Sequence, residues 1–284
     1  MLPNLIIIGA AKSGTSSLHY YLNLHPEISM SKQKELNFFN KELGWKKGIK
    51  WYKSNFTGIA KIYGESSPSY TGYPLYKGVA QRMHSVVPGA KLIYIVRDPI
   101  ERLISHYLDK VKGGQETKTI DRALEDLENA DYVCPSKYFM QLKQYLGYYP
   151  KGRILVLTAE ELRNERRPAL KRIFRFLNVD DSFYSEAFRD LKNVSAEKLK
   201  QKKPRRITRY FMSEGPGVFQ VKKIVKQIMP EPLKNRMRQA LNTGEKIDRP
   251  IVDRGLKRVL CEILREDVES LRKFTGYEFK NWSL

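Results

Sequence analysis

A lysine, a glycine and a run of hydroxyl side chains follow a short apolar stretch near the start of the chain. Leu5–Ile8 is followed by small residues and then by Lys12-Ser13-Gly14-Thr15-Ser16-Ser17. Where a strand turns into a helix, backbone N–H groups and a nearby cation converge, and such a point holds a phosphate. The segment therefore predicts a phosphate-binding loop. The alternative is an ordinary strand–turn–helix with a solvated lysine.

The order of residues in this loop differs from that of a Walker A loop. A Walker A loop reads G-x-x-x-x-G-K-[ST], with the lysine after the last glycine. Here Lys12 precedes Gly14, so the lysine enters from the strand side. A nucleotide kinase or NTPase stays open as an alternative, and it requires magnesium-dependent binding of ATP.

A second polar group ends another apolar stretch, Leu92–Val96. Arg97 and Asp98 follow it, and Ser105 comes seven residues after Asp98. Seven residues make about two helical turns, so Ser105 returns to the face on which Asp98 begins. A guanidinium and a hydroxyl can then hold one anion between them. The alternative is Arg97 paired with Asp98 or another carboxylate.

A third segment, residues 32–39, places Glu35 between two lysines and two phenylalanines. Basic neighbours favour the ionised carboxylate and apolar neighbours disfavour it, a balance that suits a general base. The alternative is a surface ion pair. The histidines are rivals for this role: His84 and His106 stay open, whereas we expect His19 and His25 to be packed or capping residues.

The elements that must position these groups alternate between strands and helices. Strands are predicted at Leu5–Ile8, Ile62–Gly64, Leu92–Val96 and Ile154–Leu157, with helices at Thr15–Leu24, Leu75–Val87, Ile100–Val111, Tyr138–Tyr149, Pro168–Leu177 and Glu262–Phe274. This alternation is typical of α/β folds with a parallel sheet covered by helices on both faces. Ligands of such sheets bind at the carboxyl ends of the strands, where the Lys12 loop belongs. We expect one domain over residues 1–284.

Composition limits the partners. The chain has 52 Lys and Arg against 31 Asp and Glu, a net charge of +21, and this positive field attracts anions. Residues 192–242 form a basic helical or loop subregion, predicted to pack on the domain, with a lid or acceptor surface as the alternative. A non-catalytic basic module for nucleic acid or anionic membrane is a further alternative, with strongly salt-dependent affinity.

The location of the protein is predicted from the same sequence. No apolar run approaches the roughly 20 residues needed to cross a bilayer. Leu5–Ala11 lacks the basic region that precedes the apolar part of a signal peptide. Two distant cysteines suit a reducing compartment. We therefore expect a cytoplasmic protein that is not transmembrane.

Six segments together resemble the sulfotransferases that use 3′-phosphoadenosine 5′-phosphosulfate (PAPS), especially the branch that includes the heparan sulfate sulfotransferases. They are Ala11–Ser17, Glu35–Phe39, Gly64–Tyr70, Val96–Pro99 with Ser105, Ser136–Tyr138 and the ending Leu271–Trp282. The resemblance covers nearly the whole chain and implies a sulfotransferase with a P-loop-like phosphosulfate site.

The resemblance also implies residue roles. Lys12 and the amides and hydroxyls of Ser13, Gly14, Thr15, Ser16 and Ser17 would hold the 5′-phosphosulfate. Arg97 and Ser105 would hold the 3′-phosphate, and Glu35 would be the base for in-line transfer to a hydroxyl or amine. Lys198–Arg206 falls where the family has a donor-binding loop. We expect no metal, because the leaving group is already a stabilised phosphate.

One departure bears on the acceptor. Heparan-type members usually read Glu-Lys-Thr-Pro where this chain reads Glu65-Ser66-Ser67-Pro68, so one cation is missing near the transferring group. The chain also lacks the C-terminal cysteine pair common in secretory-pathway members. The acceptor is therefore of unknown class, whether carbohydrate, lipid or natural product, and we expect no specific nucleic acid partner.

Overall fold

The computed structural model describes residues 1–125, 127, 131–189 and 249–284. The basic subregion 192–242 and the segment Lys198–Arg206 thus lie outside the described residues. Two compact units are distinguished: the first falls within Met1–Leu103, Leu127–Asn193 and Lys257–Leu284, and the second within Ile104–Asp126 and Val194–Leu256. In the described ranges, no helix combines the length and the apolar character needed to cross a membrane.

Five parallel strands of the first unit form one sheet in the order β2-β3-β1-β4-β5. They are β1 (Leu5–Gly9), β2 (Ile28–Met30), β3 (Ile62–Ser66), β4 (Lys91–Val96) and β5 (Ile154–Thr158). Strands buried on both faces read as nearly continuous apolar runs, which is why four of the five were predictable. Because all five are parallel, their carboxyl ends lie at one edge of the sheet.

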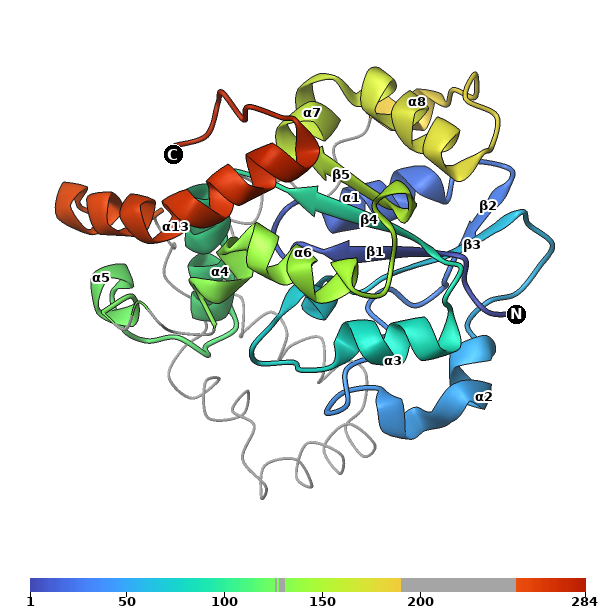
Figure 1. Ribbon diagram of the computed structural model, residues 1–284, viewed down its shortest axis with the longest axis horizontal. Helices are drawn as coiled ribbons and strands as arrows, with labels where there is room; N and C mark the ends of the chain where they lie inside the picture. The colour runs from blue at the N-terminus through green and yellow to red at the C-terminus, as the bar shows by residue number, and fades with distance from the viewer. Residues whose placement is uncertain (126, 128–130, 190–248) are drawn as a thin grey trace, which may run out of the picture. The chain divides into compact units, whose positions relative to one another are not determined.

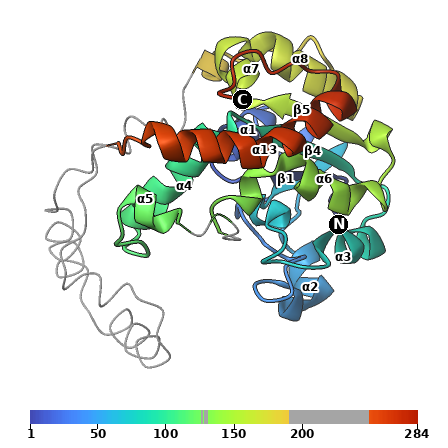
Figure 2. The ribbon, with the colours of Figure 1, turned by 60° about the vertical axis from the view of Figure 1, so that its left-hand side comes forward.

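Helices cover both faces of this sheet (Figure 1). Ile6 and Ile8 of β1 pack toward α3 (Val79–Val86), α6 (Tyr138–Leu146) and α13 (Arg254–Thr275). The alternate residues Leu5 and Ile7 pack toward α1 (Thr15–Leu22) and α8 (Arg166–Leu177). Figure 2 shows the same separation of α8 from α3. The predicted parallel sheet with helices on both faces is confirmed.

The other helices and the 3₁₀ turns of the described residues complete the list of elements. They are α2 (Gly48–Lys53), α4 (Pro99–Lys112), α5 (Ile120–Ala123), α7 (Ala159–Asn164) and the 3₁₀ turns η1 (Trp45–Lys47), η2 (Pro68–Thr71), η3 (Cys134–Ser136), η4 (Lys151–Arg153) and η5 (Glu186–Arg189).

Several predicted helix ends were wrong for local reasons. The helix expected from Leu75 begins only at Val79, because Gly78 adopts a left-handed φ of 67° and forms the N-cap. The helix expected to reach Tyr149 ends at Leu146, just before Gly147. The final helix begins at Arg254 rather than Glu262, and its buried positions are Leu260, Leu264, Val268 and Leu271.

A carboxylate of α13 caps the beginning of α6. Asp267 accepts hydrogen bonds from the backbone N–H groups of Phe139 at 2.8 Å and Met140 at 2.7 Å. These amides belong to the first helical turn, which has no intrahelical acceptors. Burial raises the pKa of Asp267 from 3.8 to about 6.

We expect Asp267→Ala to lower the free energy of unfolding by about 1–3 kcal/mol, because two partly buried amides lose their acceptor. The folded-state pKa exceeds the unfolded value, so the folded chain binds this proton more tightly. The contribution of Asp267 to stability is therefore largest below pH 4 and decreases as the pH rises to 6. Urea unfolding at pH 4.5 and 7.5 checks this, and a larger loss at pH 7.5 would contradict it.

Candidate active site

The Lys12 loop connects β1 to α1 in a conformation that depends on left-handed residues. Lys12 has a φ of 71° and Gly14, the N-cap of α1, has a φ of 95°. The loop begins at a close approach: a Cβ on Gly9 would lie 2.0 Å from Thr71 Oγ1. Ala10 N–H donates to Ile95 O at 2.6 Å, which ties the loop to β4. Glycine is therefore required at position 9 for space and is favoured at position 14 for its φ.

The loop is equipped to receive an anion. Within the described residues, the N-cap of α1 makes no side-chain hydrogen bond and its first turn contains no acidic residue. The first-turn amides of Thr15 and Ser16 thus lack the usual capping acceptor. The buried hydroxyls of Ser13 and Tyr138 lie near each other, yet neither makes a hydrogen bond of ordinary length to a described residue. These groups fit a phosphate or sulfate.

Arg97 extends from the end of β4 to the same loop. Its Nη1 donates to the backbone oxygen of Lys12 at 3.2 Å, and its Nη2 lies 3.4 Å from Glu101 Oε2. The alternative partner Asp98 is engaged elsewhere, because its Oδ1 accepts from Glu101 N–H at the start of α4. The structure therefore places Arg97 beside the Lys12 loop, as the phosphate-site hypothesis requires, although Glu101 also pairs with it.

Ser105 lies on α4, which begins at Pro99. It belongs to the second unit. The binding of one anion by Ser105 and Arg97 together therefore stays a prediction.

Glu35 lies in the segment that follows β2, at the carboxyl edge of the sheet. Its backbone N–H donates to Ser66 O at 2.9 Å, at the end of β3. Ser66 is paired in register with Ile7 of β1, two residues before the Lys12 loop begins. The Glu35 side chain is 54% exposed, and its Oε1 lies 2.5 Å from Lys34 Nζ. The ion pair considered from the sequence is therefore present, and Glu35 also lies at the predicted edge.

Comparison with known proteins places this geometry in a family. The sequence profile of the sulfotransferase domain matches residues 2–247. This chain belongs to the sulfotransferase family. Human heparan sulfate glucosamine 3-O-sulfotransferase 5 is 33% identical to this sulfotransferase over 190 residues, which cover 63% of this chain and 54% of that protein. The chain thus matches about half the length of this curated relative.

Solved structures share the fold of this sulfotransferase. A sulfotransferase from Alicyclobacillus acidocaldarius superposes with a TM-score of 0.71 at 22% identity, covering 100% of both chains. A mouse sulfotransferase complexed with PAP has a TM-score of 0.51 at 18% identity, covering 95% of this chain and 88% of that one. The family predicted from the motifs is confirmed, whereas the roles of Lys12, Arg97, Ser105 and Glu35 stay predictions.

A buried arginine of α4 holds the turn that precedes α6 in this sulfotransferase. Arg102 is fully buried and donates to Ser136 Oγ at 2.6 Å and to Tyr132 O at 2.5 Å. Burial lowers its pKa to about 10, so it stays charged at neutral pH. Its two bonds hold the turn that leads into Tyr138 and α6. Sequence reasoning missed this role, and the hydroxyl at Ser136 was the one available signal.

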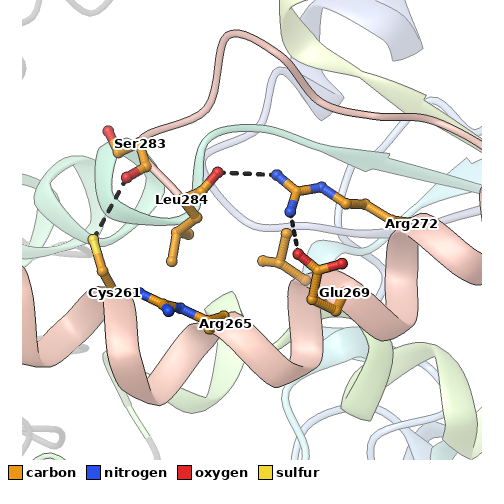
Figure 3. A pocket seen from close by; sticks show the side chains of 7 residues that line it. Cys261, Arg265, Glu269, Arg272, Ser283 and Leu284 are labelled. Atoms are coloured by element: carbon orange, nitrogen blue, oxygen red, sulfur yellow. Dashed lines mark hydrogen bonds and ion pairs between the residues drawn. The ribbon is translucent and has the colours of Figure 1, made fainter.

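The last residues of the chain return to the same region of the sulfotransferase. Ser283 N–H donates to Asp98 Oδ2 at 2.5 Å, and Trp282 packs 5.8 Å from the Tyr138 ring. Figure 3 shows Ser283 and Leu284 above α13, where they border a pocket of about 320 Å³. Arg272 is bound there by Glu269 and by Leu284 O. This segment therefore helps to fix the residue that follows Arg97.

Two histidines of the sulfotransferase have structural partners. His25 is buried, accepts from Glu27 N–H through Nδ1 and contacts Asp180 O through Nε2, which agrees with the capping role expected for it. His84 packs against Tyr148 and Tyr149 near the end of α3, which leads to the amino end of β4. It is therefore at the opposite edge of the sheet from Arg97, and this placement disfavours it as the base. His106 belongs to the second unit.

Proposed function

We propose that this protein transfers a sulfuryl group from PAPS to a hydroxyl or amine of an acceptor. The observation that carries the proposal is the meeting of Arg97 with the Lys12 loop, through the 3.2 Å hydrogen bond to Lys12 O. That contact supports the proposal because it brings a guanidinium to a strand–loop–helix turn whose first-turn amides suit an anion. The Arg97 guanidinium and the Lys12 loop together suit a donor with two phosphates. The family implies that this donor is PAPS.

Lys12 and the loop Ser13, Gly14, Thr15, Ser16 and Ser17 would bind the 5′-phosphosulfate. The open first-turn amides of α1 and the buried Ser13 hydroxyl support this assignment. Arg97 and Ser105 would bind the 3′-phosphate, which ATP lacks. The donor is thus recognised at both ends of its nucleotide.

Glu35 would remove the proton from the acceptor as its oxygen or nitrogen attacks sulfur. The new bond to sulfur forms while the bond from sulfur to the bridging phosphate oxygen breaks. Negative charge then builds on that oxygen, and the Lys12 ammonium would stabilise it. The prediction that no metal takes part rests on the stability of the phosphate leaving group, and EDTA treatment of the active protein tests it.

The acceptor is the least determined part of the reaction. The human relative acts on heparan sulfate glucosamine, as its name states, but Ser66 stands here where heparan-type members carry a lysine. Its hydroxyl is buried and forms no hydrogen bond to any described residue. The acceptor class is best found by screening carbohydrates, lipids and natural products bearing hydroxyls or amines with labelled PAPS.

The organisation and location of the protein are also proposals. A single sulfotransferase domain is supported by the family match, which runs through both compact units. A cytoplasmic location is supported by the sequence, whose two cysteines lie far apart and form no C-x-x-C pair.

Binding of the desulfated donor tests the site without an acceptor. We expect adenosine 3′,5′-bisphosphate to raise the melting temperature, whereas ATP with magnesium leaves it nearly unchanged. Arg97→Ala should weaken the bisphosphate by about 10- to 100-fold, because a charge-assisted hydrogen bond contributes about 1.5–3 kcal/mol. Arg175→Ala is the matched control, because it removes the same charge from an exposed position on α8. Stabilisation by ATP with magnesium instead would favour the kinase alternative.

A further inference from the structure

A buried carboxylate is linked to the Glu35 segment through hydroxyl side chains. Glu65, on β3, is fully buried, and its carboxylate accepts three hydrogen bonds from hydroxyl groups. Tyr52 donates to Oε1 at 2.5 Å, Tyr70 to Oε1 at 3.0 Å and Ser67 to Oε2 at 2.8 Å. A carboxylate only accepts hydrogen bonds, so each of these hydroxyls must use its single proton toward Glu65.

This fixed proton direction leaves the hydroxyl lone pairs for other donors. Ser67 Oγ accepts from Asn37 N–H at 3.0 Å, and the Tyr70 hydroxyl accepts from Phe39 N–H at 3.3 Å. The two amides lie in the segment that carries Glu35. Tyr52, by contrast, binds Glu65 but accepts no hydrogen bond from the described backbone of that segment. Glu65 therefore sets the orientation of two hydroxyls that hold the segment's backbone.

The segment needs this support because its backbone is strained. Glu35 has a φ of 64° and Asn37 a φ of 51°, a region that is costly for residues with a side chain. Further bonds reinforce the turn: Ser69 Oγ donates to Asn37 Oδ1 at 2.6 Å and accepts from Asn40 Nδ2 at 2.8 Å. Such conformations persist only where the surroundings determine them.

We propose that Glu65 is a positioning residue, which acts through Ser67 and Tyr70 to hold the strained segment and thereby places the Glu35 carboxylate. The inference rests on the proposed function, in which Glu35 is the base. Glu65 itself is enclosed by its three hydroxyl partners and does not take part in proton transfer. Glu65 therefore affects the rate of the chemical step and not the affinity for the donor.

Three single-hydroxyl variants test this with a matched control. Tyr52→Phe removes one hydrogen bond to Glu65 and none to the segment. Ser67→Ala and Tyr70→Phe each remove one hydrogen bond to Glu65 and one to a backbone amide of the segment. We expect kcat to fall about 10- to 100-fold in Ser67→Ala and Tyr70→Phe with the KM for PAPS nearly unchanged, because a small misplacement of a reacting group costs that much. Tyr52→Phe should change kcat less than about threefold while it lowers stability comparably.

A readout independent of activity accompanies the kinetics. Amide hydrogen exchange, measured by NMR on the protein with bound adenosine 3′,5′-bisphosphate, should be faster at Asn37 in Ser67→Ala and at Phe39 in Tyr70→Phe, but at neither in Tyr52→Phe. Equal kcat losses in all three variants, or unchanged exchange at both amides, would overturn the inference. If Glu35→Gln keeps full activity, the proposed base is wrong, and the exchange data still decide whether the hydroxyls bound to Glu65 hold the segment.

Discussion

Replacing Lys12 with alanine is expected to slow sulfuryl transfer by about 10²-fold or more, the loss seen when one preorganised charge-stabilising donor is removed. The lysine follows the turn after β1, where the loop faces the first turn of α1. Its left-handed φ of 71° is equally unfavourable for alanine, so the substitution adds no new backbone strain. The effect of Lys12→Ala should therefore appear in the rate of sulfuryl transfer. Single-turnover transfer from labelled PAPS measures it.

The control for Lys12→Ala is Lys41→Ala, which removes the same charge from an exposed position outside the loop. A normal rate in the control separates a local effect from the loss of one positive charge. Unchanged turnover in Lys12→Ala would remove this lysine from the mechanism.

Glu35→Gln is expected to abolish most turnover and to leave nucleotide binding near normal, because it removes the proton acceptor and keeps the shape of the side chain. The half-exposed carboxylate is accessible to an acceptor, and its backbone stays bonded to Ser66 O in the variant. The measurements are kcat with a competent acceptor and the Kd of adenosine 3′,5′-bisphosphate.

Glu42→Gln provides the matched control for this variant, since Glu42 is an exposed glutamate a few residues away. A loss of nucleotide affinity in Glu35→Gln, without a loss of kcat, would show that Glu35 has a structural role. Full activity in both variants would return the search for the base to His106.

The site was predictable where it depends on local sequence. The Lys12 loop and Arg97 each follow directly from an apolar strand, so their place at the carboxyl edge follows from the order of elements. β2 was missed because a strand of three residues carries almost no periodic signal. The contacts of Glu65 were missed for another reason: its partner Tyr52 lies on α2, and no sequence spacing predicts their meeting.

Contacts between side chains and segments far apart in the sequence were equally unpredictable. Asp267 binds the first turn of α6 from a helix 127 residues later, and Arg102 reaches Ser136 and Tyr132 from α4. In sequence these side chains read as charges on amphipathic helices. Their buried roles follow only once the helices are packed against the sheet.

The position of β1 has a consequence for biosynthesis. β1 leaves the ribosome before both strands that flank it in the sheet, β3 and β4. Its apolar side chains therefore stay without their neighbours until Val96 has been added, which takes several seconds at roughly 5–20 residues per second. During that interval the nascent chain exposes the apolar side chains of β1, which favours aggregation. We expect slower translation or lower growth temperature to change the yield of soluble protein more than its final stability.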